Sequence, residues 1–132
     1  MKTENQITAP GAVTSAPLIL LRAEGVFVFI LSILLYAHTG ASWWRFAALL
    51  LVPDLLMAGY WLGPRWGAIF YNSAHTYIGP VLLAGFAVVS SRPGLLPYSL
   101  IWTAHIAMDR ALGYGLKYPS GFKKTHLGWQ GA

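Results

Sequence analysis

HIAMDRALGYGLKY, residues 105–118, carries the most chemically committed side chains of an otherwise apolar chain. The segment begins inside an apolar helical pattern and ends in a stretch that contains glycine and lysine. His105 and Asp109 are four residues apart, so a helix places them on one face. Arg110 follows directly and adds a third ionisable group to this apolar element. We therefore expect the function of the protein to involve Asp109.

The surrounding sequence is too apolar for an ordinary soluble domain. Of its 132 residues, 56% are hydrophobic and only 10% are charged, and the mean hydropathy is +0.54. Soluble domains carry about 25% charged residues. The absence of cysteine excludes disulfides and thiolate metal ligands. We predict an integral membrane protein whose net charge of +5 reflects topology, with the lipid bilayer as its partner and no affinity for nucleic acid.

Four apolar runs are long enough to cross ~30 Å of hydrocarbon as helices that rise ~1.5 Å per residue. The residues before the first run are small and polar and are predicted to form a mobile tail. They do not resemble a signal peptide, because Arg22 and Glu24 interrupt the run that follows. The predicted organisation is a tail at 1–16, a compact all-α bundle of four transmembrane helices at 17–119 (about 18–36, 43–62, 67–89 and 97–118), and a second tail at 120–132.

The basic residues predict the orientation of this bundle. An even number of spans places both termini on one side, and that side collects most of the lysines and arginines. The opposite turns offer only Arg45 and Arg92. The positive-inside rule therefore predicts that both termini are cytoplasmic.

Polar side chains from all four spans fall in one layer. Counted from the assumed cytoplasmic ends, Glu24, Asp54, His75 and Asp109 lie at depths of about 9–14 Å. A charged group at the centre of a span costs roughly 2.5–3.5 kcal/mol, so separate exposure of these groups to lipid is unfavourable. We expect them to face one another around a cavity that opens to the cytoplasm.

Two prolines lie close to this polar layer. Pro53 directly precedes Asp54, and Pro80 lies five residues after His75. A proline inside a helix frees a backbone carbonyl one turn earlier, which is tolerated in a membrane where other groups or a cavity satisfy it.

Carboxylates and imidazoles without cysteine form a ligand set that suits Zn, Fe, Mn or Mg. A divalent metal with an open position activates water as a nucleophile. The sequence thus favours a metal-dependent, hydrolase-like membrane enzyme acting on a lipid-like or amphipathic substrate, although no spacing matches a metalloprotease signature. The predicted metal ligands are His75, His105, Asp54, Asp109 and Glu24; the predicted catalytic groups are Asp109, His105, Glu24 and His126; the predicted substrate-binding groups are Asn72, Arg110 and Lys117.

The C-terminal tail contributes two of these predictions. His126 lies among glycines and lysines, and it could fold back over the cytoplasmic mouth as a further ligand or an acid/base. The lysines of the tail suit an anionic lipid headgroup or a phosphate.

Other functions are compatible with the same residues. Chains of acids and histidines form proton relays, which would make the protein a proton or cation transporter, although the outer halves at 27–35 and 81–89 lack polar side chains. A purely structural role would pair Arg22 and Arg110 with the carboxylates. Bis-histidine haem is disfavoured, because His75 and His105 differ in depth by ~7 Å and carboxylates surround them.

Several short runs also carry a resemblance to a known family. They are LRAEG (21–25), PDL (53–55), GPR (63–65), YNSAHTY (71–77), AH (104–105), DRALGYGLKYP (109–119), GFK (121–123) and THLG (125–128). Between about Leu21 and Gly128 the chain resembles small bacterial integral membrane proteins grouped as domain of unknown function 4260. The resemblance implies four spans and a multi-pass location in the bacterial inner membrane. It implies no activity and no site residues.

Overall fold

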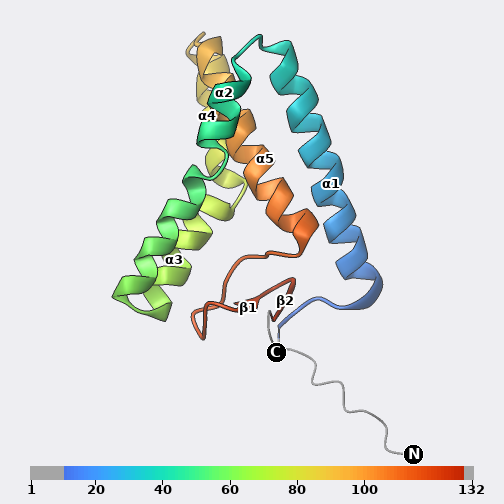
Figure 1. The fold of residues 1–132 in the computed structure, drawn as a ribbon, viewed down its shortest axis with the longest axis vertical. Coiled ribbons are helices and arrows are strands. Elements are labelled where there is room, and N and C mark those ends of the chain that lie inside the picture. The colour runs from blue at the N-terminus through green and yellow to red at the C-terminus, as the bar shows by residue number, and fades with distance from the viewer. Residues whose placement is uncertain (1–10, 130–132) are drawn as a thin grey trace, which may run out of the picture.

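The computed structural model describes residues 11–129, and it is helical as predicted (Figure 1). A short antiparallel hairpin follows the last helix and pairs Lys124 with Trp129 and Thr125 with Gly128. The elements are α1 (Ser15–His38), α2 (Trp43–Leu49), η1 (Val52–Leu62), α3 (Pro64–His75), α4 (Ile78–Val89), η2 (Pro93–Leu95), α5 (Leu96–Leu112), β1 (Lys124–Thr125) and β2 (Gly128–Trp129).

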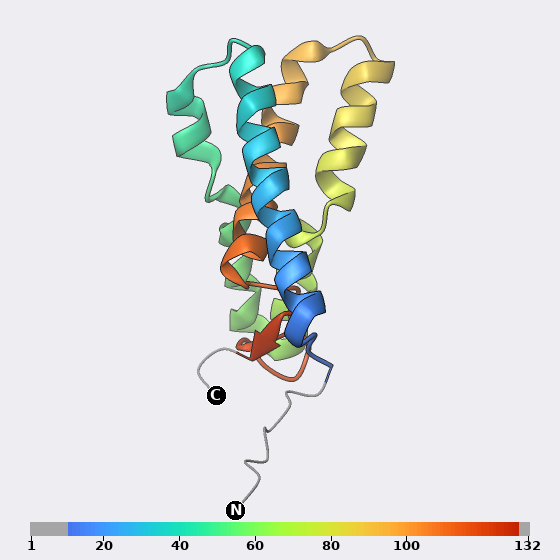
Figure 2. The same cartoon turned by 90° about the vertical axis from the view of Figure 1, so that its right-hand side faces the viewer.

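The chain runs up and down between two ends of the molecule (Figures 1 and 2). The segment made of α2 and η1 returns from the far end of α1, the segment made of α3 and α4 runs out again, and α5 comes back. α5 is central: α1 packs along it, and α2 and α4 also contact it, while η1 packs against α3. The hairpin lies beneath the end of α5, near the start of α1 (Figure 1).

A small aromatic core closes the end of the molecule at the turn between α1 and α2. Tyr36 is fully buried, and its ring meets the edge of Phe46 at a centroid distance of 5.0 Å. The Tyr36 hydroxyl donates a hydrogen bond to the carbonyl of Ser42 at 2.7 Å. Ile101 and Ala104 of α5 complete this cluster. The core thus fixes α1 and α2 against the first half of α5.

Two helical segments are long and apolar enough to cross a membrane: α1 and the continuous stretch Trp43–Leu62. In their most apolar windows only 11% and 6% of the residues are buried within the molecule. A core helix of a soluble protein would instead bury most of its apolar side chains. The apolar surface of these two segments therefore suggests association with a membrane.

Three of the predicted spans differ from the observed helices. The run at 43–62 is divided into α2 and η1, with Pro53 in the first turn of η1. The run at 67–89 is divided into α3 and α4, because Pro80 cannot donate to the preceding turn and Thr76 is extended, with φ −100° and ψ 146°. The last helix ends at Leu112, six residues before the predicted end at 118, because Gly113 takes a left-handed φ of 89° and caps it.

Candidate metal centre

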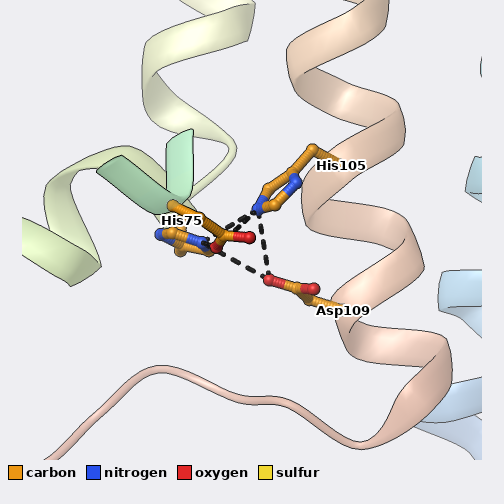
Figure 3. A group of neighbouring side chains, drawn as sticks. His75, His105 and Asp109 are labelled. Carbon is orange, nitrogen blue, oxygen red and sulfur yellow. Dashed lines mark hydrogen bonds and ion pairs between the residues drawn. The ribbon is translucent and has the colours of Figure 1, made fainter. Parts of the chain in front are cut away.

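Four ionisable side chains converge where these helix breaks meet the second half of α5 (Figure 3). Asp54 lies in the first turn of η1, and His75 is the last residue of α3. His105 and Asp109 lie one turn apart on α5, as their spacing predicts. In Figure 3 the imidazoles and the Asp109 carboxylate point toward one common position. One ligand-type atom from each of the four residues lies within 4.8 Å of the other three.

The distances within this cluster are short and nearly equal. Nε2 of His75 lies 3.0 Å from Nε2 of His105, 3.1 Å from Oδ1 of Asp54 and 3.4 Å from Oδ2 of Asp109. Nε2 of His105 lies 3.3 Å from the same oxygen of each aspartate. Ligand atoms at 2.0–2.1 Å from a tetrahedral ion are about 3.3–3.4 Å apart. The cluster therefore has the dimensions of a divalent metal site with two histidines and two aspartates.

The hydrogen bonds of His75 leave its Nε2 available to a proton or a metal ion. Nδ1 of His75 donates to the carbonyl of Tyr71 at 2.7 Å, so the neutral ring presents a bare lone pair at Nε2. That lone pair faces the carboxylate oxygens of Asp54 and Asp109, which also only accept when ionised. Acceptors that face one another at such distances require a proton or a metal ion between them.

The arginines do not neutralise the cluster. Nη2 of Arg110 donates to the backbone carbonyl of His75 at 3.0 Å, and Nε of Arg22 donates to that of Ala111 at 3.0 Å. Within residues 11–129, the ion-pair partners of Asp54 and Asp109 are the two histidines. The arrangement thus differs from the arginine–carboxylate pairs that a purely structural role would use.

The backbone carbonyls released at the end of α3 are bound by side chains of α5. The Trp102 indole donates to the carbonyl of Ala74 at 2.6 Å, and Arg110 takes that of His75. Ser99 donates to the carbonyl of Pro80 at 2.7 Å. Side chains of α5 therefore stabilise the helix break that positions His75.

Glu24, which we predicted as a fifth ligand, lies outside this group. α1 packs on the face of α5 that carries Ala107 and Ala111: a Cβ at Gly25 would lie 2.7 Å from the nitrogen of Ala111 and 2.9 Å from the oxygen of Ala107. Helix positions two residues apart point in nearly opposite directions, so Asp109 faces away from that contact. The body of α5 thus separates the exposed Glu24 from the cluster.

His126 also lies apart from the four ligands. It shares a pocket of about 140 Å³ with Glu24, Tyr77 and Arg110 on the α1 side of α5. Its Nδ1 accepts a hydrogen bond from the backbone nitrogen of Leu116 at 2.9 Å. Burial lowers the pKa of His126, and the nearby Arg110 lowers it further. His126 is therefore a neutral hydrogen-bond acceptor that holds the C-terminal tail against the segment after α5.

Asn72 hydrogen-bonds to the segment after α5 and does not line the pocket that reaches the cluster. Its amide oxygen accepts from the backbone nitrogen of Lys117 at 2.7 Å, and its amide nitrogen donates to the Lys117 carbonyl at 2.8 Å. This paired contact joins α3 to the segment after α5 across 45 residues of sequence. It leaves the side chain of Lys117 directed over the rings of Tyr71 and Phe122.

The model of the family described as Domain of unknown function (DUF4260) matches residues 18–129. The chain belongs to this family. The match covers every helix except the first three residues of α1, and it includes all four residues of the cluster. No match to the chain is found among curated proteins or among solved structures.

A pocket of about 240 Å³ gives access to the cluster of this DUF4260 domain. Asp54 and Asp109 line it together with Tyr71, Lys117 and Phe122. Asp54 is the more accessible of the two aspartates, with 32% of its side chain exposed against 14% for Asp109. A molecule in this pocket would therefore reach the aspartate side of the cluster.

Tyr71 is a site residue that the pattern of acids and histidines did not reveal. Its ring stacks on His75 at a centroid distance of 3.7 Å and an angle of 10°, and its carbonyl orients the same imidazole. Tyr71 precedes His75 by four residues, so helical spacing alone would have placed them on one face. Residues that contact and orient a metal-binding histidine commonly affect the metal affinity of the site.

Proposed function

We propose that this DUF4260 domain is a membrane protein with four crossings, two of them kinked or broken at proline, and with both termini in the cytoplasm. The alternating course of the chain and the apolar exposure of α1 and Trp43–Leu62 support this topology. Exposed apolar side chains on α4, among them Val81, Leu82 and Val89, extend the same kind of surface to a third segment.

We further propose that the cluster binds a divalent metal and that the protein is a metal-dependent, hydrolase-like membrane enzyme. One observation carries this proposal: the two imidazole nitrogens lie 3.0 Å apart, and each lies 3.1–3.4 Å from one oxygen of both aspartates, with no lysine or arginine within ion-pair distance of the aspartates in the described part of the chain. When bound, a divalent metal lowers the pKa of water and polarises a substrate oxygen.

The protein residues have distinct parts in this proposal. Asp54, His75, His105 and Asp109 hold the metal, and the pocket beside the aspartates admits the substrate. Four protein ligands complete a tetrahedral shell, whereas an ion of higher coordination number keeps positions for water and substrate. The ligand spacing is that of a tetrahedral shell, whereas the pocket at the aspartates gives an ion of higher coordination number room for water and substrate, so the site suits Zn, Fe, Mn or Mg.

Metal analysis of the detergent-purified protein tests this proposal. We expect about one equivalent of a divalent metal per chain, and its loss in the variants His75→Ala and Asp109→Asn. His38→Ala is the matched control, because His38 lies at the end of α1 and bonds only locally to the carbonyl of Leu34. Elution of each variant as a single folded species separates loss of metal from loss of fold. Absence of metal from folded wild-type protein after incubation with Zn, Mn and Fe would overturn the proposal.

A further inference from the structure

A second, apolar pocket lies beside the metal centre. It has a volume of about 460 Å³, and its walls come from α2, η1, α3, α4 and α5. Pro53 and Ala74 line it, and these residues directly precede the ligands Asp54 and His75. The indole nitrogen of Trp102 in its wall is already bonded to the carbonyl of Ala74. Apolar cavities are poorly filled by water, so this space suits hydrocarbon.

The size of this pocket limits its occupant. At about 30 Å³ for a group of the size of a water molecule, it holds about 15 such groups, which corresponds to one hydrocarbon chain. Ligand pockets commonly measure about 300–1,000 Å³ and are mostly apolar with a few precisely placed polar groups. The exposed side chains of Leu55 and Leu56 at its edge place its opening on the apolar outer surface of the molecule.

Lys117 lies in the other pocket, whose lining residue Asp54 directly follows Pro53 of the apolar pocket. Lys117 is only 6% exposed, and its ammonium group donates to the carbonyl of Phe122 at 2.8 Å and lies over the rings of Tyr71 and Phe122. No carboxylate lies within ion-pair distance of it among residues 11–129. A buried charge is normally paired, and an ammonium carries three donors. Since Lys117 lines the pocket that reaches Asp54 and Asp109, an anionic group of a ligand would complete its contacts.

We propose that the two pockets bind one single-chain anionic amphiphile, with its hydrocarbon chain in the apolar pocket, its polar junction at the four ligands and its anionic group at Lys117. The inference rests on the metal-dependent function proposed above and names its class of substrate. Entry of the chain from the bilayer requires no opening of the tail, because the apolar pocket reaches the outer surface of the helices.

Equilibrium binding of radiolabelled probes to the metal-loaded full chain in neutral detergent tests this site. The probes are oleoyl lysophosphatidate, oleate and monooleoylglycerol, which share a chain and differ in the head. We expect both anions to bind at least about tenfold more tightly than the uncharged ester, since a hydrogen bond to a charged group contributes that much. Comparison of the two anions distinguishes a phosphate from a carboxylate ligand.

Matched variants assign each end of the ligand. Lys117→Gln should abolish the preference for anions and Lys117→Arg should retain it, while the exposed Lys123→Gln serves as control. Leu83→Trp on α4 and Leu56→Trp on η1 each place a larger side chain at the apolar pocket and should weaken the binding of all three probes about tenfold or more. Leu82→Trp, on the same helix but 67% exposed and outside the pocket, should bind as wild type.

The two proposals fail separately. Equal binding of charged and uncharged probes, or equal effects of Leu83→Trp and Leu82→Trp, would overturn the amphiphile site and leave the metal analysis unaffected. Wild-type protein that binds the probes as expected but holds no metal would overturn the metal-dependent function and leave the binding site.

Discussion

The contacts of His75 fix the orientation of its imidazole toward the candidate metal position. Its Nδ1 proton is held by the carbonyl of Tyr71 and its ring face is covered by the Tyr71 ring, so Nε2 has a fixed direction. His105 differs, because its buried Nδ1 has no hydrogen-bond partner within the described chain. The two imidazoles are therefore held by different means: His75 by a hydrogen bond at Nδ1 and a stacked ring, and His105 by burial and by the contacts of its Nε2 within the cluster.

Replacement of Tyr71 tests this orientation. Tyr71→Leu should weaken metal binding by roughly 10–100-fold, as loss of groups behind a metal ligand generally does, because the stacked ring is gone. Tyr71→Phe should bind metal as wild type, since the ring and the backbone carbonyl both remain. Competition with a chelator of known affinity measures the difference. A loss of metal in Tyr71→Phe would show instead that the hydroxyl takes part.

At the scale of the elements, the breaks in two helices give the site its shape. A continuous helix over 67–89 would use the carbonyls of Ala74 and His75 internally, and Trp102 and Arg110 would have no partners there. Because Pro80 prevents that continuation, α5 binds the end of α3 through its side chains. The position of His75 relative to His105 and Asp109 thus depends on the contact between α3 and α5.

The contact between α1 and α5 depends on Gly25. Gly25→Ala should lower the free energy of unfolding by about 1–3 kcal/mol, because the new Cβ would meet the backbone of α5 at 2.7–2.9 Å. Gly85→Ala on α4 is the matched control: nothing lies within 4 Å of its Cβ, so the helix should gain up to about 1 kcal/mol. Unfolding in mixed detergent micelles measures both changes. Equal stability of the two variants would contradict close packing at Gly25.

At the scale of the whole molecule, the two ends of the described chain meet beneath the site. The backbone nitrogen of Val13 donates to the carbonyl of His126 at 2.8 Å, and the Tyr118 hydroxyl donates to that of Gly11 at 2.7 Å. Asn72 ties the same segment to α3. The segment after α5 is thus hydrogen-bonded both to the residues before α1 and to α3. Its residues Tyr114, Lys117 and Phe122 line the pocket that reaches the cluster.

The tail should loosen at mildly acidic pH. Burial lowers the pKa of His126, with Arg110 adding to the shift and Glu24 and Tyr77 lining the same pocket. The unfolded tail therefore binds a proton more readily than the folded one. The stability contributed by neutral His126 is complete above its unfolded pKa of about 6.5 and is lost as the pH falls through the folded value.

Hydrogen exchange of the Leu116 amide, corrected for intrinsic rates, measures this opening. Its protection should fall between about pH 7 and pH 5, since this amide bonds to Nδ1 of His126. His126→Gln should remove the pH dependence, and His38→Gln should keep it. A wild-type amide with the same protection throughout this range would contradict the assignment.

Much of the site follows from local rules. Composition predicted apolar helices, spacing predicted that His105 and Asp109 share a face, and the depth count placed Asp54 and His75 at the same level. The prolines indicated where the helices break. They did not indicate that the runs at 43–62 and 67–89 would each divide into two separate helices. These features depend on spacing along single helices and on the lengths of the apolar runs, which a sequence displays directly.

Other features depend on which surfaces meet. Glu24 lies at the predicted level but behind α5, because α1 packs on the face of Ala107 and Ala111. The position of the tail depends on the two hydrogen bonds between the Asn72 amide and the Lys117 backbone, which lie 45 residues apart in the sequence. Helical periodicity predicts which residues share one face of a helix. Which other helix packs against that face depends on contacts between elements that are distant in the sequence. The cluster of two histidines and two aspartates exists because α5 presents one face to α3 and η1 and the opposite face to α1.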